Sequence, residues 1–494
     1  MSRTTRRSFL KQSAALGAAV ALPYLVPQRA FGANDRINIA LAGIHARGLE
    51  HIGFFAALEG CRITHLVDPD SRLFAARAAV VEEKWGVAPR CMQDIRRALE
   101  DPSVDVVSIA TCNHWHSLMA IWACQHGKDV YLEKPCSHNV WEGRKCVEAA
   151  RKYKRIVQHG TQSRSVPFEA ATVAAVRSGK FGKLLVAKTY CCKPRWSIGF
   201  KPIKTPPPEV NFDLWLGPAP KLEYHENLVH YNWHWFWETG NADLGNQGVH
   251  EIDVARWAFG DKLPKSVVSL GGRWVNTPDY KDQGVTPNME LNVFDFDGAL
   301  MVCETRGLVA RTDKNGKVSP PVPNPLPTKV ANEFYVEGGM ITAGNFYPLR
   351  GGAPVPIENA ALKGNPAEHP EPHFQNFLDC VRSRKSEDLH AEILQGHLSA
   401  ALCHLGNISY RLGKPAAISR QPEGFPENEQ VAASLAAIEK NLTQSLNLDL
   451  SKTVYQVGPK LNFDWKAEKF IGSPEADALL TRPARKPYAV PEEV

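Results

Sequence analysis

Between residues 34 and 160 the chain alternates short apolar runs with segments of helical length. Apolar runs of this kind predict buried strands, and the segments between them predict helices. Strands that alternate with helices form a parallel sheet covered by helices on both faces. We therefore expect one doubly wound α/β domain, with strands at Ile37–Ala42, Arg62–Val67, Val106–Ala110, Val130–Leu132 and Arg155–His159.

The pattern changes after residue 160. A helix is predicted at Phe168–Ser178, and helical spacing returns between Pro372 and Leu412. The strand-like runs between them lack regular intervening helices, which favours a mainly antiparallel sheet. We expect a second α/β domain with a large open sheet over residues 161–415. Its strands are predicted at Leu184–Tyr190, Lys265–Leu270, Met289–Phe296 and Ala299–Glu304.

Both ends of the chain lie outside these two domains. Arg6 and Arg7 precede an apolar segment at residues 14–26, the pattern of a twin-arginine signal peptide, which we place at residues 1–33. The segment is shorter than the about 20 residues that cross a bilayer, so no membrane anchor is expected. We expect folded export to the periplasm or the medium. Residues 416–494 show little periodicity and are expected to wrap the surface or a partner subunit.

Loss of the signal would bring the chain close to neutrality. The formal net charge is +6, and residues 1–33 contribute five basic residues and no acidic residue. A near-neutral chain gives no electrostatic reason to expect a nucleic-acid partner. The eleven cysteines are expected to be mostly buried and reduced, because folded export implies folding in a reducing compartment. No cysteine or histidine spacing predicts a metal site.

A glycine-containing turn follows the first predicted strand. Gly43 and Gly48 occupy the first and third glycine positions of a dinucleotide fingerprint, with His45 in the second. The next strand ends in Asp68, where an acidic side chain binds the adenosine ribose diol and repels a 2′-phosphate. The joint spacing favours NAD. The alternative is that Asp68 only starts a turn before a helix beginning at Ser71.

Two neighbouring strands are followed by polar segments. A polar loop is expected at Thr111–His116, and Glu133-Lys134-Pro135 follows the strand at residues 130–132. Because ligands lie beyond the carboxyl ends of parallel strands, Lys134 is expected to point into a site. The alternative is a solvated lysine in a turn. Proline after Lys134 restricts its backbone and permits a cis peptide bond.

A second cluster lies at residues 231–253. Aromatic residues at Tyr231–Glu238 lead into a glycine-rich polar run. Asn246, His250 and Asp253 recur at helical spacing, which places them on one face of a helix. Aromatic walls beside hydrogen-bonding groups suit a sugar ring. Without the polar run, the aromatic residues would be predicted to lie in the hydrophobic core.

With these motifs the chain resembles the Gfo/Idh/MocA family, which includes glucose-fructose oxidoreductase and the inositol dehydrogenases. The resemblance runs from Ile37 to Leu412, through the glycine turn, Glu133-Lys134-Pro135 and the Gly-x-His-x-x-Asp run that ends at Asp253. It implies a Rossmann domain followed by an open α/β sheet domain that covers the nicotinamide. By this resemblance Lys134 is the active-site lysine and His250 the acid/base histidine.

The remaining site residues are assigned on the same basis. Asn246 joins Lys134 and His250 as catalytic, and a homo-oligomer, dimer or tetramer, is expected to form through the C-terminal sheet. A carbohydrate substrate is expected to contact His234, Trp235, Arg164 and Asp253. NAD is expected to contact Gly43, His45, Arg47, Gly48, Asp68, Thr111, Asn113, His116, Glu133, Lys134 and Gln162.

Two residues depart from the family pattern. His45 replaces the second glycine, and Asn246 stands where sugar dehydrogenases of the family usually carry Asp, so His250 loses a partner that would favour its protonated form. Three functions stay open: an oxidoreductase of a sugar or polyol CH–OH group with a tightly retained NAD, an NAD-dependent glycosidase that works through a 3-keto sugar, and an inactive sugar-binding protein. Lys134, which those glycosidases tend to lack, favours the first.

Overall fold

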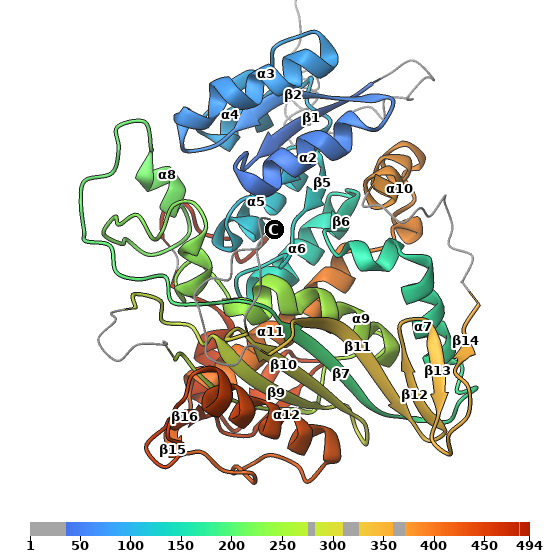
Figure 1. The fold of residues 1–494 in the computed structure, drawn as a ribbon. Helices are drawn as coiled ribbons and strands as arrows, with labels where there is room; N and C mark the ends of the chain where they lie inside the picture. The colour runs from blue at the N-terminus through green and yellow to red at the C-terminus, as the bar shows by residue number, and fades with distance from the viewer. Residues whose placement is uncertain (1–35, 275–281, 310–325, 359–370, 484) are drawn as a thin grey trace, which may run out of the picture. The chain divides into compact units, whose positions relative to one another are not determined.

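The predicted parallel sheet is present in the computed structural model, which describes residues 36–274, 282–309, 326–358, 371–483 and 485–494. Six strands pair in the order β3-β2-β1-β4-β5-β6, and every pair is parallel (Figure 1). This is the order of a dinucleotide-binding doubly wound sheet. The strands are β1 (Ile37–Ala42), β2 (Cys61–Val67), β3 (Arg90–Met92), β4 (Val106–Ile109), β5 (Asp129–Leu132) and β6 (Val157–His159).

Helices connect these strands, and one begins earlier than expected. The polar loop predicted at Thr111–His116 is wrong beyond Cys112, because the helix starts at Asn113 and buries His114, Trp115 and His116 in its first turn. The Trp115 ring packs against Gly217 of the second domain, which explains its burial. The helices are α2 (Ala46–Ala56), α3 (Phe74–Trp85), α4 (Ile95–Leu99), α5 (Asn113–Gln125) and α6 (Val140–Lys152).

The second sheet is large and mainly antiparallel, as predicted. Within the described residues it has twelve strands, and among their pairs β10 with β7 is parallel while the others are antiparallel. The strands are β7 (Leu184–Cys192), β8 (Ser266–Gly272), β9 (Met289–Asp295), β10 (Leu300–Arg306), β11 (Lys329–Val336), β12 (Gly339–Thr342), β13 (Asn345–Pro348), β14 (Val355–Pro356), β15 (Lys414–Ala417), β16 (Val454–Val457), β17 (Leu461–Asp464) and β18 (Lys469–Ile471).

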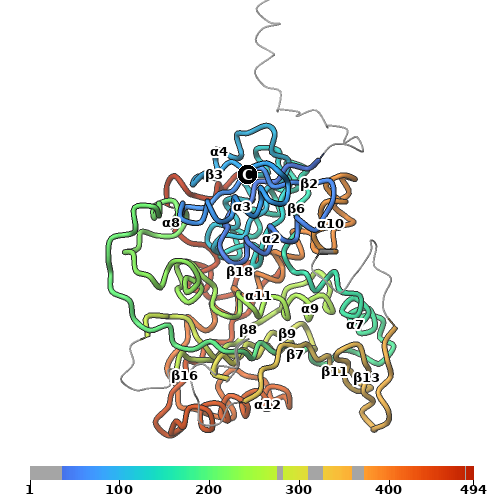
Figure 2. Tube along the Cα trace, turned by 45° about the horizontal axis from the view of Figure 1, so that its top comes forward, coloured from blue at the N-terminus to red at the C-terminus, as the bar shows by residue number. Residues whose placement is uncertain are grey.

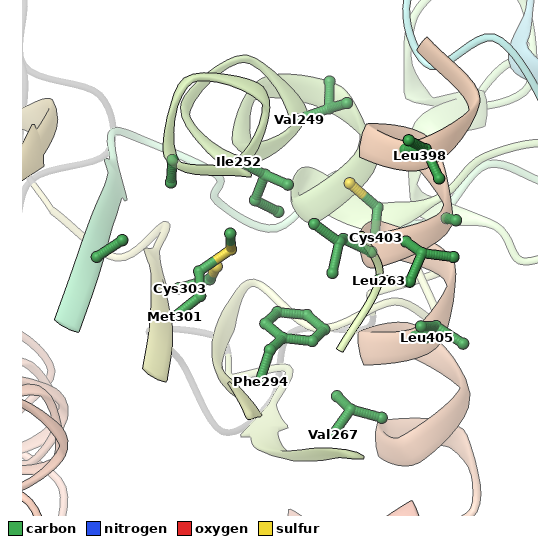
Figure 3. Packing of buried hydrophobic residues seen from close by; sticks show 14 of the residues in the cluster. Val249, Ile252, Leu263, Val267, Phe294, Met301, Cys303, Leu398, Cys403 and Leu405 are labelled. Carbon is green, nitrogen blue, oxygen red and sulfur yellow. The ribbon is translucent and has the colours of Figure 1, made fainter. Parts of the chain in front are cut away.

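Helices α7 (Pro167–Arg177), α9 (Val249–Phe259) and α11 (Ile393–Arg411) pack on one face of this sheet. Figure 3 shows Val249 and Ile252 of α9, Leu398 and Leu405 of α11 and Phe294 of β9 as parts of one hydrophobic cluster. These side chains are at most 4% exposed, so α9 is fixed between the sheet and α11. The first turn of α9 is thereby held at the edge of the Rossmann domain.

The C-terminal tail folds onto its own chain. Strands β15 to β18 extend the second sheet, and α12 (Glu429–Lys440) packs Val431, Leu435 and Ile438 on the face opposite α9. In Figures 1 and 2 this helix lies beside the strands of that sheet. We expected this segment to wrap a surface, and it adds regular strands and a helix to the sheet instead. Further short helices are α8 (Phe212–Leu216), α10 (Glu371–Ser383) and α13 (Pro474–Asp477).

The last residues of the chain return to the Rossmann domain. Arg482 donates hydrogen bonds to Glu142 of α6 at 2.6 and 3.1 Å, and Tyr488 lies edge-on to Trp115, with ring centroids 5.4 Å apart. The predicted signal peptide, residues 1–33, lies outside the described residues. Among the described helices, none has both the length and the apolar character needed to cross a membrane.

Candidate active site

The turn after β1 has the geometry of a pyrophosphate cradle. Gly43 has φ +80°, and a Cβ on it would lie 2.5 Å from the carbonyl oxygen of Ala110. A Cβ on Gly48 would lie 1.9 Å from the Gly43 carbonyl oxygen, so both positions require glycine. His45 precedes α2 with an exposed side chain, whose ring stacks on His230 with centroids 4.4 Å apart. The turn therefore accommodates His45 by holding its ring to one side.

A cavity of about 230 Å³ lies beside this turn, at the carboxyl ends of β1, β2, β4 and β5. Asp68 borders it, and its carboxylate accepts hydrogen bonds from the backbone N–H groups of Ile44 at 3.0 Å and Asp70 at 2.9 Å. An acidic residue at this strand end and a helix N-terminus at the glycine turn fit a dinucleotide. The predicted site residues that line the cavity are Gly43, His45, Arg47, Asp68, Thr111, Asn113, His116, Glu133, Lys134, His234 and Asn246.

Glu133 ties the glycine turn to the end of β5. Its Oε1 accepts hydrogen bonds from Arg47 Nε at 2.7 Å and from Gln162 Nε2 at 3.4 Å, and it lies 3.1 Å from His51 Nε2. Burial alone would raise the pKa of Glu133, but the Arg47 charge and the His51 contact hold it well below its usual range. Glu133 is therefore a fixed carboxylate that positions Arg47. His51, fully buried on α2, was missed by the sequence prediction.

Lys134 follows Glu133 and points to the second domain. Its ammonium donates to the Asn246 backbone carbonyl at 2.8 Å and lies 3.4 Å from the Asn246 side-chain oxygen. Burial lowers its pKa, and the Glu133 carboxylate opposes that shift. The Lys134–Pro135 peptide bond is cis. His116 supports this segment, because its ring nitrogens lie 2.6 Å from the Pro135 carbonyl oxygen and 3.0 Å from the Thr111 carbonyl oxygen.

Asn246 lies on a π-helix, η4 (Leu244–Gly248), that leads directly into α9. A Cβ on Gly245 would lie 2.5 Å from Asn241, so glycine is needed for this close turn. His250 follows on α9 and is half-buried. Burial and the nearby Lys134 ammonium lower the pKa of His250, which keeps its ring neutral at pH 7. His250 is not among the residues that line the cavity, but it is close enough to Lys134 to feel its charge, and a neutral imidazole can accept a proton.

Two cations of this region were missed by the sequence prediction. Lys193 and Arg195 directly follow β7, at the carboxyl end of that strand. Arg195 forms a 2.7 Å ion pair with the fully buried Asp243, and Asp243 also accepts from Asn246 Nδ2 at 3.4 Å. The Lys193 ammonium contacts the Gln247 side-chain oxygen. The sequence signal that could have revealed them is their position, because both cations lie within five residues of the end of the strand predicted at Leu184–Tyr190.

Residues 193–243, here called the strap, run from β7 to η4 and cross the Rossmann domain. Ser71 N–H donates to the Glu209 carbonyl at 3.1 Å, and Asn211 N–H donates to the Pro69 carbonyl at 2.9 Å. His230 Nε2 lies 2.7 Å from the Asp70 carboxylate. The strap thus borders the cavity with Leu214, Trp215, His230, Tyr231, Trp233 and His234.

Three predicted substrate residues lie elsewhere. Arg164 and Asp253 form a 2.7 Å ion pair with both side chains at most 3% exposed, and Asp253 also accepts from Ser399 at 2.6 Å. Neither residue lines the cavity, so the structure does not support the prediction that they bind substrate. They form a buried ion pair that joins α9 to its neighbours instead. Trp235 is also buried beside Arg195, whose guanidinium carbon lies 5.5 Å from its ring centroid.

The comparisons with known proteins agree with this geometry. Residues 37–161 match the family described as "Oxidoreductase family, NAD-binding Rossmann fold", and residues 186–307 match "Oxidoreductase family, C-terminal alpha/beta domain". The chain therefore carries both domains of the Gfo/Idh/MocA oxidoreductase family, and its first domain is an NAD-binding Rossmann domain.

Relatives and solved structures are more distant. Glycosyl hydrolase family 109 protein 2 of Shewanella sp. (strain ANA-3) is 29% identical over 223 residues, 40% of this chain and 48% of the relative. The scyllo-inositol 2-dehydrogenase (NAD(+)) of Bacillus subtilis (strain 168) is 24% identical over 263 residues, 53% of this chain and 64% of the relative. The chain thus spans about half to two thirds of the length of these relatives.

Among solved structures, aldose-aldose oxidoreductase from Caulobacter crescentus is similar with a TM-score of 0.52 and 18% identity, over 74% of this chain and 94% of that chain. A levoglucosan dehydrogenase is similar with a TM-score of 0.53 and 18% identity, over 75% of this chain and 96% of that chain. At this identity the likeness shows the fold.

Proposed function

We propose that this NAD-dependent oxidoreductase acts on a CH–OH group of a sugar, polyol or related carbohydrate, with an NAD that it retains tightly. The observation that carries the proposal is the Lys134 ammonium, held by Asn246 in a cavity that begins at the glycine turn. A buried cation near a neutral histidine suits a hydroxyl that must lose a proton as it is oxidised.

Bound NAD supplies the acceptor for the hydride that leaves the hydroxyl-bearing carbon. Lys134 hydrogen-bonds the reacting hydroxyl and stabilises the negative charge that develops on its oxygen. We assign the hydroxyl proton to His250, because its lowered pKa leaves it neutral and it lies four residues after Asn246, in the first turn of α9. Asn246 orients the Lys134 ammonium through its backbone and side-chain oxygens.

The strap supports a carbohydrate substrate. It borders the cavity with Tyr231, Trp233 and His234, and the His234 ring stacks on Trp233 with centroids 3.6 Å apart. Aromatic faces beside polar groups bind the alternating apolar and hydroxyl surfaces of a sugar ring. The name of the Bacillus subtilis relative, an inositol dehydrogenase, points to a polyol as well.

Retention of NAD is supported by the same segment. Backbone hydrogen bonds at Ser71 and Asn211 and the His230–Asp70 contact fasten the strap beside Asp68, the expected adenosine end of the cofactor. The end of the chain reinforces it, because Arg485 donates to Asp213 of α8 at 2.6 Å. Release of a dinucleotide would require these contacts to open.

Redox-neutral cleavage of a glycoside is the second candidate, favoured by the 29% identical glycosyl hydrolase family 109 relative. Lys134, which the glycosidases of this kind tend to lack, weighs towards net oxidoreduction. An inactive sugar-binding protein is the third reading, and the presence of both Lys134 and His250 argues against it.

We also propose folded export by the twin-arginine route and self-association. Because α12 covers β8, β9 and β10, the free surface for a homo-oligomer is at β11–β14, where Val330 is 45% and Val355 45% exposed. Light scattering after gel filtration tests this, and Val330→Lys is expected to shift the assembly to monomer.

A single-turnover experiment tests the proposed oxidation. The purified full chain, loaded with NAD, is mixed with a panel of hexoses, inositols, hexuronates and glycosides while absorbance at 340 nm is followed. We expect reduction of the bound nucleotide by at least one carbohydrate, in a stoichiometry that does not exceed the enzyme. A panel of simple aliphatic alcohols is the control, and reduction by alcohols alone contradicts the carbohydrate assignment.

A further inference from the structure

We propose that Lys193 forms a binding position for a carboxylate of the substrate, so that the preferred carbohydrate is an anionic one such as a hexuronate. The inference rests on the proposed function, because Lys193 adjoins the same cavity: it contacts Gln247, the residue next to the cavity-lining Asn246. It adds a substrate class and a specificity-determining residue.

Two lysines contact consecutive residues of the π-helix η4. Lys134 contacts the two oxygens of Asn246, and Lys193 contacts the side-chain oxygen of the next residue, Gln247. The charge of Lys193 contributes to lowering the pKa of Lys134, so the two ammonium groups are close enough to repel each other. Lys193 directly follows Cys192, the last residue of β7.

The acidic groups around them are already engaged. Asp243 takes the guanidinium of Arg195 at 2.7 Å and the thiol of Cys191 at 3.3 Å. Glu251 accepts from Gln247 Nε2 at 3.0 Å, and burial raises its pKa to about 8, which leaves it mainly uncharged at neutral pH. The third acid, Glu133, is paired with Arg47.

The site therefore carries unbalanced positive charge. Within the described ranges, no carboxylate oxygen lies within 4 Å of the Lys134 or Lys193 ammonium, and each contacts only neutral amide oxygens. Partly buried cations are stabilised by an opposite charge. A neutral sugar would leave the charge of Lys193 unpaired as water is displaced, whereas a carboxylate beside the reacting carbon would pair with it.

The geometry favours a carboxylate over a phosphate. The guanidinium of Arg195 is neutralised by Asp243 through Nε and donates Nη1 to the Pro194 carbonyl at 3.0 Å, whereas the Lys193 ammonium has no acidic partner among the described residues and one amide contact, which leaves it two further donors. One positive charge with two free hydrogen-bond donors matches the single negative charge of a carboxylate. A phosphate dianion needs more donors and is usually bound by free arginines or by helix N-termini.

The test compares matched ligands on wild type and three variants. Titration calorimetry with the NAD-loaded full chain measures binding of glucuronate, glucose and glucose 6-phosphate, and the same ligands are followed at 340 nm. We expect wild type to bind glucuronate about 10- to 100-fold more tightly than glucose, as for a charge-assisted hydrogen bond. In Lys193→Met the ratio should fall to near one, and Lys193→Arg should retain most of it.

Lys201→Met is the matched control, because Lys201 is an exposed lysine on the same segment and should leave the ratio unchanged. Melting curves show whether each variant is folded. If Lys193→Met does not fold, the ratio measured for Lys193→Arg provides the test. Equal binding of glucuronate and glucose by wild type, or an unchanged ratio in Lys193→Met, overturns the inference. Tighter binding of glucose 6-phosphate overturns the choice of carboxylate.

The two proposals fail separately. Lys193-dependent binding of glucuronate without any absorbance change refutes the proposed oxidation and leaves the carboxylate position intact. Oxidation of a neutral sugar by a protein that shows no preference for glucuronate supports the proposed oxidation and refutes the carboxylate position.

Discussion

The ammonium nitrogen of Lys134 lies 2.8 Å from the backbone carbonyl oxygen of Asn246, a residue 112 positions further along the chain. Lys134 lies two residues beyond β5 of the Rossmann sheet, and Asn246 belongs to the π-helix that opens α9 of the second domain. The hydrogen bond therefore joins the Rossmann domain to the second domain at the border of the cavity. Loss of either partner should affect chemistry more than folding.

Lys134→Ala is the most direct test of this relationship. A positioned cation at a developing negative charge contributes about 100- to 1000-fold in rate, so reduction of bound NAD by substrate should fall by that factor. Bound nucleotide and melting temperature should stay close to wild type. Lys145→Ala, on α6 and paired with Glu148, is the matched control and should retain full rate. Near wild-type turnover in Lys134→Ala would falsify the role.

His250→Asn tests the general base. Proton transfer by a positioned side chain contributes about 100- to 10,000-fold, so turnover should collapse while the melting temperature holds. The opposite pattern, a lower melting temperature with preserved turnover, would identify a packing residue.

The pH profile gives a second check on His250. Burial and Lys134 lower the pKa of His250, and the base works only when deprotonated. Wild-type rate should therefore stay flat as pH falls from 8 through the ordinary histidine range near 6.5 and decline only below it. A decline centred near 6.5 would show a solvated histidine in place of the expected buried one.

Asp253→Ala tests the correction made for the Arg164–Asp253 pair. Removing one member of a buried ion pair leaves an uncompensated charge and costs about 3–5 kcal/mol. We expect a large drop in melting temperature with little change in substrate affinity for the fraction that remains folded. A selective rise in the Michaelis constant at unchanged stability would restore the original assignment of Asp253 as a substrate residue.

That pair shows where the sequence stops being sufficient. Asn246, His250 and Asp253 share helical spacing, so the pattern predicted them on one face, but of the three Asn246 alone is among the residues that line the cavity. The pattern could not show that Arg164, from the short 3-10 helix Gln162–Ser165 after β6, pairs with Asp253. A buried pair and a ligand-binding pair have the same residue types, and only tertiary packing separates them.

The sheets were predictable for a different reason. Buried strands leave apolar runs, so β1, β2 and β4 to β6 of the first sheet and β7 to β10 of the second were found from pattern alone. The eight-residue β11, mostly only partly buried, was missed. β3 has three residues, two of them exposed, and left no such signal. The strap has no periodicity, so its path across Asp70 could not be predicted, although Tyr231 and His234 of the predicted aromatic cluster do border the cavity.

NAD should remain with the purified protein. The strap contacts at Ser71, Asn211 and His230 must open before the dinucleotide leaves, so nucleotide should appear in the supernatant only after denaturation. Removal of one charge-assisted hydrogen bond weakens such a closure by about 10- to 100-fold, and His230→Ala should release NAD that much faster on dialysis. Arg72→Ala, which removes another partner of Asp70 outside the cavity, is the control. Purified protein free of dinucleotide would refute retention.

The last prediction separates the two chemistries that share this site. A retained cofactor must be restored in every cycle, so net oxidation of one sugar requires a second substrate with a carbonyl group to take the electrons back. Glycoside cleavage restores it internally, because oxidation at C3 allows elimination of the aglycone, and hydration and reduction follow. Both routes use the same cation and the same base, so Lys134 and His250 variants cannot distinguish them.

They differ in what leaves the site. With net oxidoreduction, steady turnover should require an added keto-sugar or aldose acceptor, and an oxidised sugar or lactone should accumulate in equal amount to the reduced acceptor. With glycoside cleavage, an aryl glycoside should release its aglycone with no acceptor present, and deuterium from the solvent should appear at C2 of the product, because elimination exchanges that hydrogen. We expect acceptor-dependent turnover, since the glycosidases that use this chemistry tend to lack the lysine found here as Lys134. Aglycone release without acceptor, together with deuterium at C2, would assign the protein to the glycosidase chemistry instead.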